Sequence, residues 1–359
     1  MINAVYRGAF IKELLEWYYE QNYNFPWRNS HDPYSIWLSE VMLQQTRVST
    51  VLPYYKRWLS VFPDIPSVAK TNIDSILKLW EGLGYYSRAR NFYRACQIVI
   101  EKYGGEVPRD PSEFLKLPGA GPFINAAVMS IAFNLPVPAI DANAARVVSR
   151  LICINKPFPQ SKKRIYSFLA GLIDPSIPGT FNQAIMDLGR EICTPKTPAC
   201  YACPVSSHCL GYMNNTVDKY PIKIKRPPLP HYNAAVGMVW KNNKVLISKR
   251  KESGFLGGLW EFPGGRVRPG ESGSCCVIRE VQKRLNVLVN PMCCVKKIRQ
   301  TYSHFSISID AYRCKYRSGR PRAMGYSDYC WVYPYEVHKF AFHRAGSKLF
   351  DVIKRDASV

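Results

Sequence analysis

The stretch Leu117–Val147, LPGAGPFINAAVMSIAFNLPVPAIDANAARV, decides the fold of the first part of the chain. It opens with a turn that contains Gly119 and Gly121, and the apolar run after the turn predicts a helix over 124–133. Asp141 follows a proline-containing segment. A glycine turn between helices lets backbone N–H groups approach a phosphate, and the next helix N-terminus adds partial positive charge. The alternative is a structural helix–turn–helix corner in which Asp141 caps a helix.

A second carboxylate lies on an apolar helix that we expect to start near Pro33. At helical spacing, the neighbours of Glu40 are Ile36, Trp37 and Leu43, so its side chain lies on or beside the apolar stripe. Burial there raises the pKa of a carboxyl group and makes it a candidate proton donor near neutral pH. The alternative is a structural glutamate paired with a base, and a second carboxylate facing it would favour the catalytic interpretation.

The charge balance favours a polyanionic partner. The chain has 359 residues, a length typical of about two domains. Its formal net charge is +23, with 49 Lys and Arg against 26 Asp and Glu, and nucleic acid is the commonest partner of such a protein. The sequence contains no transmembrane run and no secretory signal, so we expect an intracellular protein whose 12 cysteines are thiols or metal ligands.

Four cysteines follow the helical part of the chain with close spacing, Cys193-x6-Cys200-x2-Cys203-x5-Cys209. In an intracellular protein this pattern predicts a closed thiolate metal site. The spacing alone does not distinguish zinc from a [4Fe–4S] cluster, because both accept four thiolates.

The second part of the chain differs in composition. Residues 214–231 contain four prolines and four basic residues and predict an extended, semi-rigid linker. Residues 231–359 carry 23 Lys and Arg against 9 Asp and Glu, so this part should also contact a polyanion. Helices are expected over 9–20, 161–173 and 179–192, with two or three more within 64–103, and strands over 233–240, 244–249, 294–301, 305–314 and 328–333.

Several motifs together carry a resemblance to a known family. They are WLSEVMLQQT around Glu40, GLGYYSRAR over 82–90, LPGAG, FNQAIMDLG and the cysteine spacing. The chain resembles the helix-hairpin-helix DNA glycosylases with an iron–sulfur cluster, and among them the MutY family of adenine glycosylases. The resemblance covers nearly the whole chain and is looser in the C-terminal part.

The resemblance implies an all-α helix-hairpin-helix domain over 1–213, with the hairpin at about 110–135 and an iron–sulfur loop at 193–209, then the linker and an α+β Nudix-like domain over 232–359. It implies one [4Fe–4S] cluster. It also implies excision of adenine from duplex DNA containing 8-oxoguanine·A or G·A mispairs. We expect a monomer in a bacterial cytoplasm, associated with the nucleoid and not with a membrane.

The resemblance also assigns catalytic roles to four residues. Glu40 protonates adenine N7 and later activates water, while Asp141 stays ionised and stabilises the cationic sugar, as paired carboxyl groups do in glycosidases. Asn143 orients Asp141 by a hydrogen bond, and Arg28 anchors the site.

The implied DNA contacts lie in three other places. Gln45 and Tyr85 are wedge residues beside the lesion, and the amides of Gly119 and Gly121 hold a phosphate. In the C-terminal domain, Thr301-Tyr302-Ser303-His304-Phe305 resembles a loop that reads 8-oxoguanine. Ser303 hydrogen-bonds the N7–H/O8 edge of the lesion base, and His304 supports the search for it. Without the resemblance, the same stretch is an ordinary turn between strands.

Three departures from the family pattern have consequences. Phe123 stands where bifunctional relatives have a Schiff-base lysine and many family members have tyrosine, so we expect a monofunctional glycosylase with little lyase activity. Ala142 replaces a glycine between Asp141 and Asn143, which we expect to be tolerated. Lys283 and Arg284 replace the paired glutamates of a Nudix box, so phosphohydrolase activity should be absent.

Three alternatives remain open from the sequence. The first is a related glycosylase that acts on thymine or an oxidised pyrimidine. The second is a Nudix nucleotide hydrolase with an added DNA-binding part. The third is a catalytically silent protein that binds lesions or mismatches. The Glu40–Asp141 pair disfavours the last alternative, and Lys283 and Arg284 disfavour the second.

Overall fold

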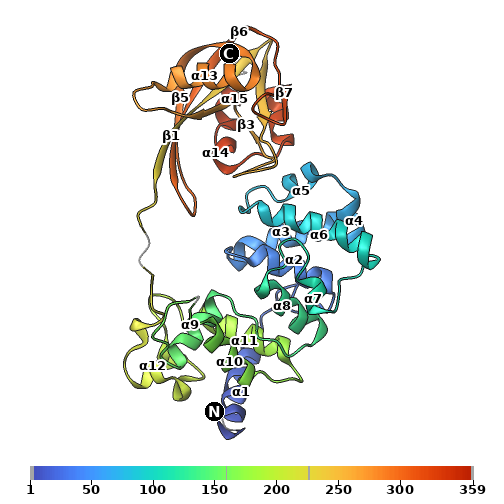
Figure 1. Ribbon diagram of the computed structural model, residues 1–359, viewed down its shortest axis with the longest axis vertical. Helices are drawn as coiled ribbons and strands as arrows, with labels where there is room; N and C mark the ends of the chain where they lie inside the picture. Colours follow the sequence, from blue (N-terminus) through green and yellow to red (C-terminus); the bar gives the residue numbers. More distant parts are fainter. Residues whose placement is uncertain (1–3, 159, 225–226, 357–359) are drawn as a thin grey trace. The chain divides into compact units, whose positions relative to one another are not determined.

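The computed structural model describes residues 4–158, 160–224 and 227–356 of the chain (Figure 1). Two compact units are present: Met1–Lys70 with Asn91–Arg226, and Thr71–Arg90 with Pro227–Val359. The division falls within the segment predicted as a linker, of which residues 225 and 226 lie outside the described part. The grouping of Thr71–Arg90 with the second unit was not indicated by the sequence.

The first unit is helical, as predicted. Its helices are α1 (Ala4–Glu20), α2 (Pro33–Leu43), α3 (Val48–Val61), α4 (Ile65–Lys70), most of α6 (Ser87–Tyr103), α7 (Pro111–Phe114), α8 (Pro122–Phe133), α9 (Ala142–Leu151), α10 (Lys162–Leu172), α11 (Pro178–Glu191) and α12 (Leu210–Met213). Helix α1 begins before the expected residue 9, because Tyr6 in its first turns packs against the same core as Phe10. No helix within the described residues is long and apolar enough to cross a bilayer.

Aromatic packing holds α2 in place. Asp32 caps this helix by accepting from the N–H groups of Tyr34 and Ser35, with Pro33 as the first helical residue. Trp37 then makes edge contacts with Phe92 of α6, at a centroid distance of 4.7 Å, and with Phe114 of α7. These contacts bury the helix on nearly every side, and Glu40 is carried inside with it.

A second cluster joins α1, α9, α10 and α11. Phe10, Val148, Leu169 and Phe181 are fully or almost fully buried in it, one from each helix. The cluster fixes the N-terminal end of α9 beside α11, which brings the residues before α9 close to polar groups of α11.

The turn before α8 requires glycine. Gly119 has φ +82, and a Cβ there would lie 3.0 Å from the Cβ of Asn91. Any other residue would be strained in this left-handed conformation. Gly121 precedes Pro122 as the N-cap of α8, and within the described residues no side chain caps this helix. The backbone at the helix N-terminus is therefore open to a ligand.

The second unit contains a mixed sheet covered on both faces (Figure 1). Its strands are β1 (His231–Lys241), β2 (Lys244–Lys249), β3 (Trp260–Glu261), β4 (Gly264–Arg266), β5 (Val287–Thr301), β6 (Ser306–Gly319) and β7 (Asp328–Val332). The order is β3-β2-β1-β6-β5, with β4 paired to β1 and β7 to β2, and β1 runs parallel to β6.

Helices cover each face of this sheet. Helix α13 (Gly273–Leu285) packs with Leu246 of β2, whereas Val245 and Ile247 point to the core shared with α14 (Arg344–Ser347) and α15 (Phe350–Asp356). The alternation is the period of two expected for a strand buried on both sides. The predicted α+β fold of this part is confirmed.

Most predicted strands are present, but β5 begins at Val287 and not at residue 294. Its register with β6 shifts near Pro291 and Cys294, and such bulges break the alternation from which a strand is predicted. The short strands β3 and β4 were also not predicted, because they have two and three residues.

Helix α5 (Ile73–Leu79) belongs to the second unit and packs beside its sheet domain. Lys249 Nζ of β2 pairs with Asp74 at 2.7 Å. The backbone N–H of Phe342 donates to Glu81 Oε1 at 2.9 Å. These polar contacts explain why Thr71–Arg90 groups with the C-terminal part of the chain.

Candidate active site

Glu40 is a buried carboxyl group with an elevated pKa. Its residue is only 7% exposed, because α2 is packed on nearly all sides. Burial raises the pKa of Glu40 to about 7, with the charge of Arg28 acting to lower it and those of Asp141 and Asp187 acting to raise it. A substantial fraction of the group is therefore protonated at neutral pH, which suits a general acid.

Arg28 forms an ion pair with a second buried carboxylate. Its Nη2 donates to Asp187 Oδ2 of α11 at 2.7 Å, and Asp187 also pairs with Arg190 at 3.0 Å. The Nε of Arg28 is buried and has no hydrogen-bond partner among the described residues. An unsatisfied buried donor beside Glu40 is suited to a polar ligand atom. Asp187 lies in the FNQAIMDLG motif but was not singled out from the sequence.

Asp141 is the N-cap of α9. Its Oδ1 accepts from the N–H of Ala144 at 2.7 Å, and its Oδ2 accepts from Asn143 Nδ2 at 2.8 Å. Burial raises the pKa of Asp141, while these hydrogen bonds and the charge of Arg146 act to lower it. The structural interpretation of Asp141 as a cap is thus correct, and the same donors stabilise the ionised form that a catalytic role requires.

Arg146 connects this carboxylate to the cysteine-containing loop. Its Nη2 donates to Asn143 Oδ1 at 2.9 Å and to the carbonyl of Gly189 at 2.7 Å, and its Nε donates to the carbonyl of Cys193 at 2.7 Å. A Cβ at Gly189 would lie 2.7 Å from that of Asn143, so glycine permits α11 to approach α9. Sequence reasoning missed Arg146, although an arginine one turn after Asn143 was a visible signal.

The four cysteines line a single cavity. Cys193, Cys200, Cys203 and Cys209 surround it together with Arg150, whose Nη1 donates to Cys193 Sγ at 3.3 Å. Burial raises the pKa of the Cys203 thiol to about 12, so the positive charge of a metal is needed to hold it as a thiolate near neutral pH.

The arrangement of the sulfur atoms bears on the kind of metal site. Among the described residues, no three His, Cys, Asp or Glu side chains converge closely enough to hold one metal ion. A single zinc needs all its ligands at about 2.3 Å from one point. A four-iron cluster instead binds each of four cysteine thiolates through a different iron, and four cysteines around one cavity are the donor set that it requires.

The proposed wedge residues share an uncommon backbone conformation. Gln45, after the end of α2, has φ 55, and Tyr85, before α6, has φ 48. Both are exposed, Tyr85 to 42%. Exposed residues that are not glycine and adopt left-handed φ values often occur at functional sites. Gln45 belongs to the first unit and Tyr85 to the second.

The loop between β5 and β6 forms a tight turn. The N–H of Tyr302 donates to the carbonyl of Phe305 at 2.8 Å, which leaves Ser303 and His304 exposed at the tip. Ser303 Oγ lies 2.9 Å from His304 Nδ1. The structure thus presents the two side chains assigned to lesion recognition next to each other.

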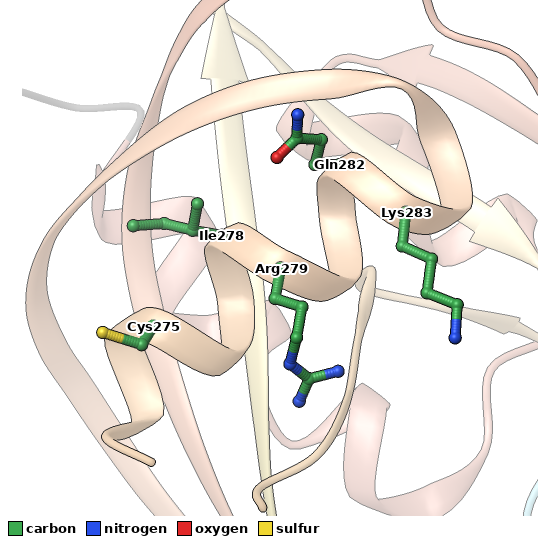
Figure 2. Close-up of a pocket in the computed structure, with 5 residues that line it drawn as sticks. All are labelled: Cys275, Ile278, Arg279, Gln282 and Lys283. Atoms are coloured by element: carbon green, nitrogen blue, oxygen red, sulfur yellow. The ribbon is translucent and has the colours of Figure 1, made fainter.

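The Nudix-like box is occupied by ion pairs. Arg284 Nε donates to Glu280 Oε2 at 2.7 Å, and Arg279 Nε donates to Glu271 Oε1 at 2.7 Å. Figure 2 shows Arg279 and Lys283 on one side of α13, in a hollow that Cys275, Ile278 and Gln282 also line. Lys283 and Arg284 place two cations where a bound Mg²⁺ would need anionic ligands, and the absence of phosphohydrolase activity stays a prediction.

Comparison with known proteins gives a consistent assignment. The HhH-GPD superfamily of base excision DNA repair proteins matches residues 38–175, and a NUDIX domain matches residues 235–352. The adenine DNA glycosylase of Mus musculus is 32% identical, over 90% of this chain and 75% of that protein.

A bacterial relative and a solved structure agree with this assignment. The adenine DNA glycosylase of Buchnera aphidicola subsp. Baizongia pistaciae is 35% identical, over 71% of this chain and 73% of that protein. The structure of a thermostable thymine-DNA glycosylase superposes with a TM-score of 0.54 and 30% identity, covering 58% of this chain and 97% of that one.

Proposed function

Because the chain belongs to the adenine DNA glycosylases, enzymes of base excision repair that act on DNA, we propose that it excises adenine mispaired with 8-oxoguanine or with guanine. The observation that carries the catalytic part is the buried Glu40 carboxyl group, whose pKa is raised by burial and further by the charge of Asp141. Glu40 is thereby prepared to donate a proton, and Asp141 to remain an anion.

Excision starts on an adenine that has left the base stack, because the glycosidic bond is not accessible within a duplex. Glu40 transfers its proton to adenine N7, and the N9–C1′ bond breaks with its electron pair passing to the base. The sugar becomes an oxocarbenium-like cation, which the Asp141 carboxylate stabilises. Water then adds to C1′ and loses a proton to Glu40, which restores the acid.

Neighbouring side chains hold this pair of carboxyl groups. Asn143 and the N–H of Ala144 donate to Asp141 and keep its oxygens oriented. Arg28 limits the pKa of Glu40 and offers its unsatisfied Nε to the substrate. The pair of Arg28 with Asp187 restrains the guanidinium group, because its Nη2 donates a charge-assisted hydrogen bond to a buried carboxylate.

We propose that Cys193, Cys200, Cys203 and Cys209 hold one [4Fe–4S] cluster, on the basis of the cavity that they line. The cluster would supply structural cross-links within the loop that joins α11 to α12, and no redox step. Arg150 donates to Cys193 Sγ and to the carbonyls of Thr194 and Tyr220, so it would brace the loop around the cluster.

DNA contacts are proposed at the positions whose backbone is open or exposed. The amides near Gly119 and Gly121 would hold a phosphate at the uncapped end of α8. Gln45 and Tyr85 would fill the space left by the flipped base. Ser303 would hydrogen-bond the N7–H/O8 edge of 8-oxoguanine, with His304 beside it. We take the protein to act as a monomer, because one chain carries both the catalytic pair and this loop.

The enzyme is proposed to be monofunctional. Phe123, at the start of α8, is half-buried and packs against the core of the first unit. Its ring cannot form an imine with the sugar, so strand cleavage would need a later step or enzyme.

A single-turnover assay tests this proposal. A duplex with one 8-oxoguanine·A pair, labelled on the adenine strand, is incubated with the protein, and half of each sample is treated with alkali. Strand nicking only after alkali is the expected result. Nicking without alkali would contradict the monofunctional mechanism. Binding of the duplex without excision would favour the catalytically silent alternative.

A further inference from the structure

An aromatic side chain from a loop distant in sequence packs against the turn that carries Ser303 and His304. Phe255, in the connection between β2 and β3, makes edge contacts with Tyr302 at a centroid distance of 4.9 Å, with His304 at 5.6 Å and with Phe305 at 5.2 Å. The interplanar angles of 86°, 80° and 68° are those of favourable edge-to-face pairs.

The hydrogen bonds of the turn itself do not tie its tip to the domain. One joins the backbone of Tyr302 to that of Phe305, and the other joins Ser303 to His304 at the exposed tip. Both lie within the turn. The three ring contacts of Phe255 connect the turn to another part of the second unit, so they restrict where the tip can lie.

The backbone of Phe255 is itself held by an arginine that pairs with a buried carboxylate. Arg250 Nε donates to the carbonyl of Phe255 at 3.1 Å, while Arg250 Nη1 donates to Glu261 Oε2 at 2.7 Å. Glu261 is buried, and although burial acts to raise its pKa, the hydrogen bond from His343 and the charge of Arg250 lower that pKa to about 2. The carboxylate is therefore ionised at neutral pH, and the anchor of Arg250 persists.

The loop backbone is closed around the same arginine. The N–H of Gly258 donates to the carbonyl of Arg250 at 3.1 Å, opposite the contact to Phe255. Arg250 thus fixes the two ends of the segment that carries the ring, and Phe255 remains 40% exposed at its tip. The backbone on both sides of this exposed ring is therefore fixed by hydrogen bonds to Arg250.

We propose that Phe255 is a positioning residue that orients Ser303 and His304 toward the lesion base and so sets the preference for 8-oxoguanine·A over G·A. This proposal rests on the proposed function. Phe255 acts through its ring contacts with the turn, and the excision chemistry at Glu40 and Asp141 does not depend on it.

The position of the turn affects one substrate more than the other. Guanine lacks the N7–H and the O8 atom that Ser303 is proposed to recognise, so a displaced turn removes a contact made only with 8-oxoguanine. Excision from an 8-oxoguanine·A duplex should therefore slow when the ring is lost, while excision from a G·A duplex should change little.

The test compares single-turnover excision rates on the two duplexes. The variants are Phe255→Ala, Phe255→Tyr, Ser303→Ala and the double variant Phe255→Ala with Ser303→Ala. Tyr335→Ala is the matched control, because Tyr335 is exposed in the same unit and stacks on Tyr333, and among the described residues it makes no ring contact with 302–305. Thermal unfolding of each protein is measured alongside.

We expect Phe255→Ala to lower the excision rate on the 8-oxoguanine·A duplex, divided by the rate on the G·A duplex, by about tenfold, because three ring contacts are removed. Phe255→Tyr keeps the ring and should retain the ratio. The double variant should be no worse than Ser303→Ala, since both changes remove the same recognition step. Tyr335→Ala should match the wild type.

Two outcomes would overturn the proposal directly. One is a Phe255→Ala protein with the wild-type ratio, and the other is an equal loss on both duplexes, which indicates a general structural defect. A wild-type protein that excises adenine equally fast from both duplexes also overturns this proposal but leaves the proposed function standing, whereas a wild-type protein that excises adenine from neither duplex contradicts the proposed function itself. The wild-type measurement alone therefore separates the two failures.

Discussion

The side chains of Arg146 and Asn143 are joined by a hydrogen bond of 2.9 Å from Nη2 to Oδ1, and Asn143 in turn donates to Asp141. The Nε of Arg146 donates to the carbonyl of Cys193, so one guanidinium group contacts both the support of the catalytic carboxylate and the cysteine loop. A disturbance of the loop is therefore expected to reach Asp141 through a short series of polar contacts.

Replacement of Arg146 should impair both stability and excision. Arg146→Ala leaves the carbonyls of Cys193 and Gly189 without this donor, and removing one partner of a buried hydrogen bond costs about 1–3 kcal/mol. We expect a lower free energy of unfolding and slower single-turnover excision. Arg164→Ala, at an exposed position of α10, is the control, measured by the same urea titrations and rates. An Arg146→Ala protein equal to the wild type in both would contradict the coupling.

The excision rate should fall as the pH rises through about 7. The pKa of Glu40 is raised to about 7 mainly by burial, and only the protonated carboxyl group can donate to adenine. The folded protein also binds this proton more tightly than the unfolded chain, so the contribution of Glu40 to stability is present at low pH and lost as pH rises from its ordinary pKa toward 7.

Single-turnover excision rates measured between pH 5.5 and 9 would show this fall as the descending limb of the pH–rate profile, with a slope of about tenfold per pH unit at its steepest. A rate that is constant across this range would contradict the role of Glu40 as the acid.

Asp187 should tune that pH dependence. Its negative charge raises the pKa of Glu40, and it also pairs with Arg28, whose charge lowers the same pKa. Asp187→Asn removes the anion and leaves the arginine free to act on Glu40. The descending limb of the pH–rate profile should then shift to lower pH. Breaking the buried pair should also lower the free energy of unfolding, by at most about 3–5 kcal/mol. If the descending limb of the Asp187→Asn profile stays at the wild-type pH, Asp187 has only a structural role.

Loss of a cysteine from the cavity should remove the proposed cluster. Purified wild-type protein is expected to contain about four iron atoms and to absorb visible light broadly. Cys203→Ser should lower the iron content and destabilise the fold. Cys275→Ser, at an exposed thiol on α13, is the control and should retain the iron. Zinc in stoichiometric amount without iron in the wild type would contradict the cluster.

The local features of the catalytic unit could be predicted from the sequence. The capping position of Asp141 and the apolar neighbours of Glu40 follow from helical spacing, which depends only on nearby residues. The left-handed glycine at Gly119 follows from the turn chemistry of the LPGAG motif. These predictions needed no knowledge of which helices meet.

The remaining contacts depend on residues that are distant in the chain. Asp187 approaches Arg28 across 159 positions, and Arg146 reaches Cys193 across 47. No periodicity marks such pairs, because helix packing creates them. The contact of Phe255 with the 302–305 turn was missed for the same reason. The early start of β5 was missed because its bulges break the alternation of apolar residues.

Whether Glu40 is the acid that drives adenine excision is tested most directly by measuring the release of free adenine from an 8-oxoguanine·A duplex, by the wild type and by Glu40→Gln, in a single turnover at pH 7. We expect the wild type to release adenine and the variant, which cannot donate a proton but keeps the shape of the side chain, to be slower by about 10²–10⁴-fold. Release by Glu40→Gln at the wild-type rate, or no release by the wild type, would contradict the role of Glu40 as the acid in adenine excision.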